Sequence, residues 1–170
     1  MVASSTVHID GYENLDHAPT DLHDQRFDLD AMIFDAARRR WSGRFFRRLY
    51  DPTRTTRERT GLLTVRDYFP VIECTLTLDN VTACRALDKS HIVIYTFNKC
   101  ERTAFGCTLR FCEDLAIDIE VEGGVIVGDL REREFDRRGY VQKWGPAESS
   151  IRLEGEDYPN DPGRRRLTSA

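Results

Sequence analysis

The stretch YFPVIECTLTLD, residues 68–79, has the pattern from which we predict the fold. Ile72, Cys74, Leu76 and Leu78 alternate with polar residues, at the period of two that a half-buried strand requires. Apolar and β-branched residues remain concentrated from there to Val127. We interpret residues 68–127 as the strands of one sheet.

Three later segments support this interpretation. Residues 92–97 are apolar on both faces, which predicts a central strand covered on both sides. Residues 107–112 and 115–121 alternate again, as half-buried strands do. Gly123-Gly124 follows at once, and two glycines permit the positive φ angles of a two-residue hairpin loop, so we predict a hairpin there.

The residues before the sheet have a helical pattern instead. Apolar residues recur at helical spacing between Leu29 and Ala37, which predicts a first helix capped by Asp28 or Asp30 and closed by the arginines up to Arg40. Residues 44–50 predict a second short helix, which Asp51-Pro52 ends.

The length of 170 residues favours one domain. We predict an α+β fold, mainly an antiparallel β-sheet with one or two N-terminal helices packed on one face. Residues 1–26 are predicted to be a mobile polar leader, 27–153 the globular domain and 154–170 a disordered tail. Within the domain, the charged run at 129–138 is interpreted as a solvated helix or loop, and 149–153 as a last edge strand.

Charge and hydropathy restrict the class of protein. The net charge of −4 argues against a chain that coats nucleic acid with its whole surface, although a local basic patch remains compatible with it. The 25 basic residues are 22 Arg and 3 Lys, which reflects either nucleotide bias in the gene or selection for the bidentate guanidinium. No window approaches the length of an apolar membrane span, so we expect a soluble intracellular protein of the cytoplasm or nucleus.

The first candidate site is the arginine-rich segment, residues 38–59, where nine guanidiniums stand among aromatic rings. Such a segment suits a phosphate backbone with stacked bases, so we predict binding to RNA or single strands, or to an acidic protein partner. The alternative is a pair of amphipathic helices whose arginines are solvated or paired with the abundant acids. The predicted binding residues are Arg38, Arg39, Arg40, Trp41, Arg44, Arg47, Arg48, Arg54, Arg57 and Arg59.

Other chemistry has weaker support. Cys84, His91, Cys100, Cys107 and Cys112 lack the close pairs that structural zinc uses, so we expect reduced, partly buried thiols and no metal or cofactor. The outward carboxylates of Asp118, Glu120 and Glu122 resemble a divalent-metal site, although no lysine lies between Lys99 and Lys143 to assist it.

We therefore predict a non-enzymatic binding or assembly protein that uses the arginine-rich segment to hold nucleic acid. Its composition suits a small viral accessory or structural protein. Two alternatives stay open: a protein–protein adaptor or homo-oligomeric scaffold without nucleic acid, and a metal-dependent enzyme that uses the acidic strand face.

Overall fold

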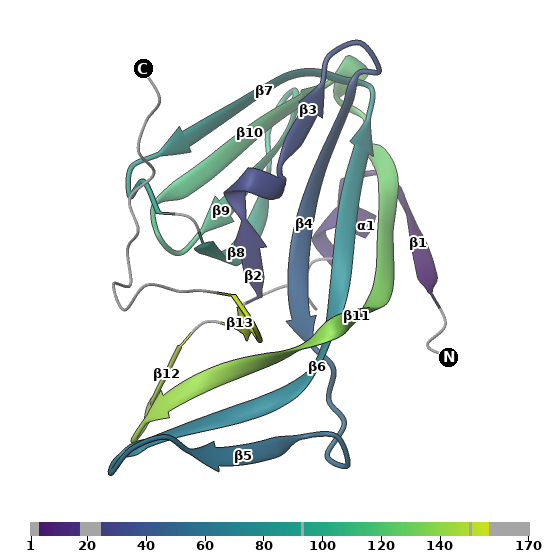
Figure 1. Ribbon diagram of the computed structural model, residues 1–170. Coiled ribbons are helices and arrows are strands. Elements are labelled where there is room, and N and C mark those ends of the chain that lie inside the picture. The colour runs from purple at the N-terminus through teal and green to yellow at the C-terminus, as the bar shows by residue number, and fades with distance from the viewer. Residues whose placement is uncertain (1–3, 18–24, 93, 150, 157–170) are drawn as a thin grey trace.

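The computed structural model describes residues 4–17, 25–92, 94–149 and 151–156. Antiparallel strands dominate these residues, and none of the helices among them is long and apolar enough to cross a membrane (Figure 1). Within the described residues the helical elements are α1 (Tyr12–His17) and two 3-10 turns, η2 (Leu29–Ala31) and η3 (Glu122–Gly124). The strands are β1 (Ser5–Asp10), β2 (Arg26–Asp28), β3 (Ile33–Asp35), β4 (Arg40–Arg48), β5 (Thr56–Arg59), β6 (Thr64–Asp79), β7 (Val81–Asp88), β8 (Ile94–Arg102), β9 (Gly106–Phe111), β10 (Leu115–Val121), β11 (Val127–Trp144), β12 (Ala147–Glu148) and β13 (Arg152–Leu153).

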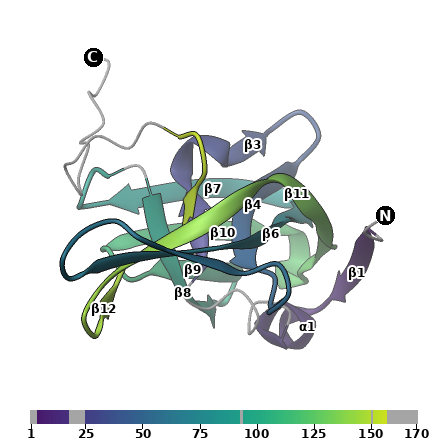
Figure 2. The same cartoon turned by 60° about the horizontal axis from the view of Figure 1, so that its bottom comes forward.

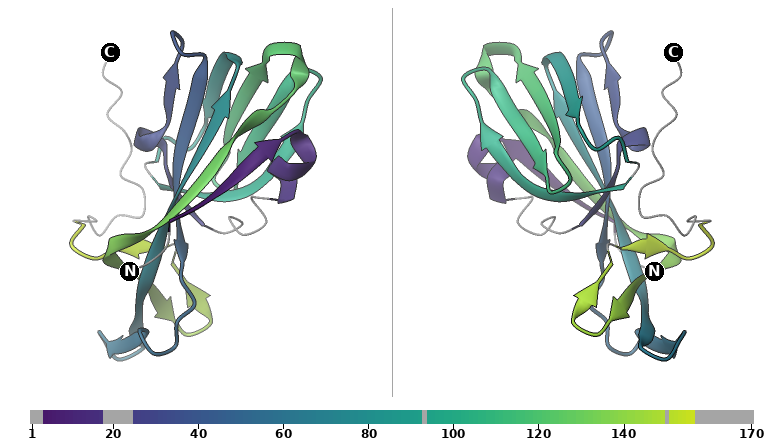
Figure 3. Two further views of the ribbon diagram at one scale, coloured as in Figure 1. Left: turned by 90° about the vertical axis from the view of Figure 1, so that its right-hand side faces the viewer. Right: turned by 90° about the vertical axis from the view of Figure 1, so that its left-hand side faces the viewer.

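The sheet runs in the order β1-β11-β6-β4-β2-β8-β9-β10-β7 and bends so that its two halves face each other (Figure 3). The main core lies between the halves and contains the fully buried rings of Phe27, Trp41, Phe45 and Tyr95. Leu15 of α1 is also buried there. Apolar residues at every second strand position supply this core, which is why the strands form with one face inward.

The longest ladder joins β6 to β11 and extends from the pair Val127–Asp79 to the pair Trp144–Thr64. At the upper end in Figure 1, β4 and β1 flank this pair of strands. At the lower end, β5 flanks β6, and β12 and β13 flank β11. We call the projecting lower part, residues 56–70 and 138–148, the stalk (Figures 1 and 2).

The stalk leaves the body at an irregularity in this ladder. Glu134 pairs with Ile72 and Arg138 with Pro70, so β11 has four steps where β6 has two. A bulge of this kind bends a strand, and Pro70 fits beside it because it has no N–H to donate. A second apolar cluster packs at this bend, made of Phe46, Phe69, Val71, Val141, Ile151 and Leu153, with Phe135 beside them. The stalk base is therefore anchored by its own small core.

The predicted α+β class, with N-terminal helices packed on one face of the sheet, is wrong, because this part of the chain forms strands and turns. Residues 29–31 form only a 3-10 turn, residues 33–35 form β3, and residues 40–48 form β4. Trp41 and Phe45 explain the error, since a spacing of four places two side chains on one face of a helix and also on one face of a strand. The aromatic content of β4 favours the strand.

Two further predictions about the sheet are wrong. Gly123 and Gly124 do have positive φ angles of 66° and 68°, yet the strands they connect are not paired with each other. β10 pairs with β7 and β9, whereas β11 pairs with β1 and β6. The charged run at 129–138 is neither helix nor loop but part of β11.

The alternating segments were predicted correctly as strands. They correspond to β6, β9 and β10, and the segment from residue 92 contributes the central strand β8, which lies between β2 and β9. Of the edge strand predicted at 149–153, residues 152–153 form β13 beside β11, and residue 150 lies outside the described residues. The division into leader, domain and tail stays a prediction. Residues 5–10 of that leader pair with β11 as β1, and residues 157–170 lie outside the described residues.

Gly128 gives a test of the β6–β11 ladder. A Cβ at this position would lie 2.0 Å from the carbonyl oxygen of Thr77, and this backbone atom is held in the neighbouring strand. We predict that Gly128→Ala lowers the free energy of unfolding by about 1–3 kcal/mol, measured by urea denaturation. Gly61→Ala is the matched control, because its nearest contact is the Thr64 hydroxyl at 3.3 Å. Equal urea midpoints for the two variants would contradict this register.

Candidate binding surfaces

The predicted nucleic-acid-binding residues lie on strands and in turns and loops, so they do not share one helical face. Arg38 lies in the turn between β3 and β4, and Arg39 there has a positive φ of 52°. The others are Arg40, Trp41, Arg44, Arg47 and Arg48 on β4, Arg54 in the following loop, and Arg57 and Arg59 on β5. Successive residues of a strand point to opposite faces, so the set is distributed over both sides of the sheet. Trp41 is 0% exposed in the main core and is not available to stack on a base.

Carboxylates already engage seven of the nine predicted arginines. Arg47 makes two hydrogen bonds to Glu132, at 2.9 and 3.1 Å, and this contact lowers the pKa of that carboxyl. The other pairs are Arg38–Asp35 (3.7 Å), Arg39–Glu122 (2.9 Å), Arg40–Asp79 (2.7 Å), Arg44–Glu73 (3.8 Å), Arg57–Asp67 (2.6 Å) and Arg54–Glu134. Exposed pairs add little stability, but each neutralises a cation that a phosphate would otherwise attract.

Arg48 and Arg59 form no carboxylate pair with the described residues. The Arg48 guanidinium lies 4.5 Å from the centre of the Phe69 ring and 5.2 Å from that of Tyr50. Arg59 donates to the backbone carbonyls of Gly61 and Leu62, at 3.2 and 2.9 Å. The arginine-rich segment therefore presents two unneutralised cations near the stalk.

The carboxylates of Asp118, Glu120 and Glu122 do not come together at one site. Asp118 accepts a hydrogen bond from Thr108 at 2.7 Å and lies 3.5 Å from Arg85. Glu122 lies beyond the strand in η3 and pairs with Arg39. Among the residues that the structure describes, no group of three or more His, Cys, Asp or Glu side chains could hold a metal ion.

Most of the thiols in the body are partly or fully buried. Cys74 and Cys107 are buried and Cys84 is half-buried, whereas Cys112 is exposed. Burial raises the pKa of Cys74 to about 12 and that of Cys84 to about 11. Nucleophilic cysteines need the thiolate, so these two are poor candidates for catalysis.

The sequence reasoning missed an apolar surface at the end of the stalk. Leu62 is 83% exposed and Leu63 is 79% exposed, in the turn between β5 and β6. Trp144, at the end of β11, is 45% exposed and pairs with Thr64 directly after that turn. We call Leu62, Leu63 and Trp144 the stalk tip. The Leu-Leu pair after Thr60-Gly61 was the available signal, because a glycine marks a turn, where apolar side chains face water.

Ion pairs hold the strands behind this tip together. Asp67 of β6 is 5% exposed at its side chain and accepts two hydrogen bonds from Arg57 of β5, at 2.6 and 2.9 Å. Lys143 of β11 lies 3.1 Å from Asp67 and 3.1 Å from Glu148 of β12. One buried carboxylate thus links three strands and extends through Lys143 to the fourth.

Arginines and tyrosines stack on the opposite face of the stalk. Tyr68 and Tyr140 are directly paired, with ring centres 5.5 Å apart. The guanidinium of Arg66 lies 5.0 Å from the Tyr140 ring, and that of Arg138 lies 5.1 Å from the Tyr68 ring. Such stacks restrict long side chains and add to the rigidity of the stalk.

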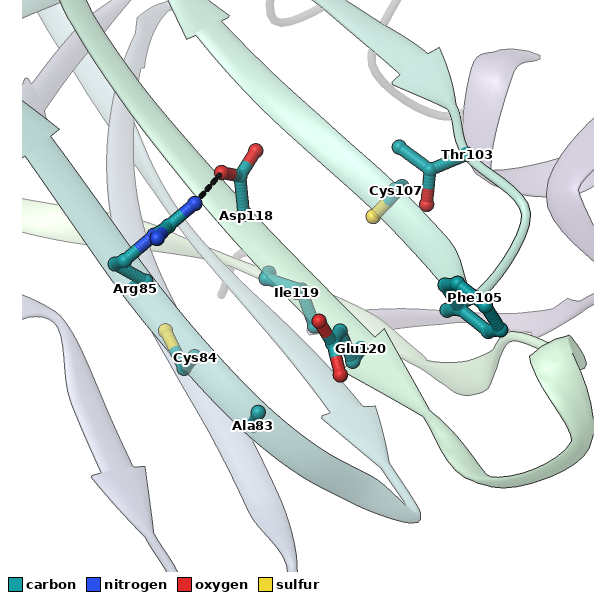
Figure 4. A pocket seen from close by; sticks show the side chains of 9 residues that line it. All are labelled: Ala83, Cys84, Arg85, Thr103, Phe105, Cys107, Asp118, Ile119 and Glu120. Carbon is teal, nitrogen blue, oxygen red and sulfur yellow. Dashed lines mark ion pairs between the residues drawn. The ribbon is translucent and has the colours of Figure 1, made fainter.

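A hollow of about 420 Å³ lies at the outer strands of the other sheet half (Figure 4). Its apolar lining includes Ala83, Cys84, Phe105 and Ile119. Asp118, Glu120 and Arg85 add charge, while Thr103 and Cys107 complete the lining. Phe105, in the loop between β8 and β9, is 67% exposed, so its ring is not needed to fill the core.

The chain matches no protein-family model, no curated protein and no solved structure.

Asp67 gives a pH test of the stalk. The hydrogen bond from Arg57 is the main cause that lowers its pKa from 3.8 to about 2, and Lys143 acts in the same direction. Because the folded-state value lies below the unfolded value, the stabilisation is complete above about pH 4 and is lost as the pH falls towards 2. We predict that Asp67→Asn costs about 1–2 kcal/mol at pH 7 and almost nothing near pH 2.

Urea denaturation at several pH values measures this difference. Glu58→Gln is the control, since Glu58 lies on the exposed strand β5 and forms no ion pair with the described residues. A loss of stability in Asp67→Asn that stays constant from pH 7 to pH 2 would show that the carboxylate does not provide the link.

Proposed function

We propose that this protein is a non-enzymatic assembly protein that binds further copies of the same chain through the stalk tip. The exposure of Leu62, Leu63 and Trp144 carries the proposal. Apolar side chains that gather on the surface of a soluble domain mark interaction sites, and Trp is enriched among the residues that dominate binding energy. The two apolar clusters that hold the fold together contain none of these three residues.

The stalk is suited to present such a tip. The Asp67 links and the Arg–Tyr stacks fix its strands before a partner arrives. A surface that is ordered in advance loses less conformational entropy on binding, so more of the apolar contact appears as affinity. Projection from the body also lets the tip enter a concave surface.

Nucleic-acid binding, predicted from the arginine-rich segment, is a second candidate. One contact favours it: the Arg48 guanidinium stacks against Tyr50, whose ring is 83% exposed. An exposed aromatic ring beside a cation resembles the stacking platforms of single-strand binders. The seven neutralised arginines and the net charge of −4 weigh against it.

Sedimentation of the purified protein tests the proposed function with a second copy as the probe. We expect the average mass of the wild type to rise above 19.7 kDa with concentration, and that of L62S/L63S to stay at this value. V7S is the matched control, because Val7 is 48% exposed on β1, away from the stalk, and this variant should assemble like the wild type. A wild type that remains monomeric up to about 1 mM, where a contact of about 4 kcal/mol is detectable, would contradict the proposal.

Retention of labelled single-stranded RNA by the protein distinguishes the two candidate functions. The proposed function predicts no retention at low salt. The second candidate predicts retention that falls steeply with salt concentration and is lost in Y50S. Retention with this pattern would make nucleic acid the ligand.

A further inference from the structure

The stalk tip and the hollow lie at opposite ends of the molecule. In Figure 1 the tip of β5, β6 and β11 is at the bottom, while β7 and β10, which line the hollow, are at the top. A contact between two different surfaces of the same chain joins copies head to tail. Such a contact is possible only if the two surfaces are complementary in shape, polarity and charge.

The hollow has an apolar lining and an acidic margin. Phe105 and Glu120 both line it, with Glu120 beside Ile119 on β10 and Phe105 on the loop before β9 (Figure 4). Asp118 lies 3.5 Å from Arg85, whereas Glu120, exposed on β10, forms no ion pair with the described residues. The hollow therefore offers apolar contact beside one unneutralised carboxylate.

The stalk tip has the complementary arrangement. Leu62 and Leu63 supply apolar side chains, and Arg59 and Arg66 stand on the strands just behind them. Arg59 and Arg66 form no ion pair with the described residues, and Glu58 is the cross-strand neighbour of Arg66. Two leucines with cations behind them match an apolar hollow beside the unpaired carboxylate of Glu120.

We propose that the stalk tip of one copy inserts into the hollow of a second copy, with Leu62 and Leu63 against Phe105 and Arg66 near Glu120. This inference rests on the proposed function and names the partner surface. Contact between two tips is disfavoured, because it would bring Arg59 and Arg66 of both copies together. The head-to-tail contact leaves one tip and one hollow unused, so assembly continues into a ring or a filament.

Complementation between two variants tests the contact. The L62S/L63S variant has a disabled stalk tip and an intact hollow. The F105S variant has an intact stalk tip and a disabled hollow. Each should be monomeric alone, and an equimolar mixture should form a pair of twice 19.7 kDa that grows no further. Circular dichroism and thermal melting establish that both variants are folded.

The possible failures are distinguishable. If L62S/L63S is monomeric but F105S assembles like the wild type, the hollow is not the partner surface and the function of the tip still stands. If both folded variants are monomeric and their mixture forms no pair, head-to-tail insertion is overturned. A monomeric wild type overturns both proposals.

A charge exchange checks the orientation. We expect E120K to weaken assembly by about tenfold, because it places a cation beside Arg66, and R66E to weaken it similarly. The combination R66E/E120K should recover most of the wild-type affinity. An additive loss in the double variant would show that these two side chains do not meet.

Discussion

The long ladder between β6 and β11, with its bulge between Glu134 and Arg138, is the constraint on which the rest of the structure depends. Its upper half contributes Cys74, Leu76, Leu78 and Leu130 to the main core. Its lower half leaves the body and becomes the centre of the stalk. Because the same two strands run through both parts, the position of the tip is tied to the packing of the core. The second cluster at the bend, around Phe69 and Val71, fixes this connection.

Charge in this protein mainly joins strands. Arg47 and Glu132 connect β4 to β11, Arg133 and Glu73 connect β11 to β6, and Arg57 and Asp67 connect β5 to β6. The 29 acidic residues outnumber the 25 basic ones and supply the carboxylate partners for these arginines. This pairing also changes the functional argument, because a guanidinium held by a carboxylate attracts phosphate weakly. Exposed apolar side chains, rather than cations, then become the distinctive feature of the surface.

The sequence predicted secondary structure well where one face of a strand packs on the core, and much less well elsewhere. β6, β9 and β10 could be predicted because their apolar residues alternate. β4 could not, since Trp41 and Phe45 fit a helix as well as a strand. β11 was missed because Arg131–Glu134 are charged on both faces, and only the neighbouring strands reveal their partners. Gly123 and Gly124 indicated their positive φ angles, but strand pairing depends on distant segments. The stalk tip was missed although Gly61 marked a turn before Leu62 and Leu63, because the turn alone does not show that both side chains stay exposed in the fold.

Native-state hydrogen exchange along β6 tests most directly whether the stalk and body form one unit. The account predicts that ladder amides on both sides of Pro70, in residues 65–69 and 71–78, open with similar free energies near that of global unfolding. Exchange of residues 65–69 orders of magnitude faster than that of residues 71–78 would show that the stalk opens independently. A stalk of that kind would not hold its tip in a fixed position, and the central claim would be contradicted.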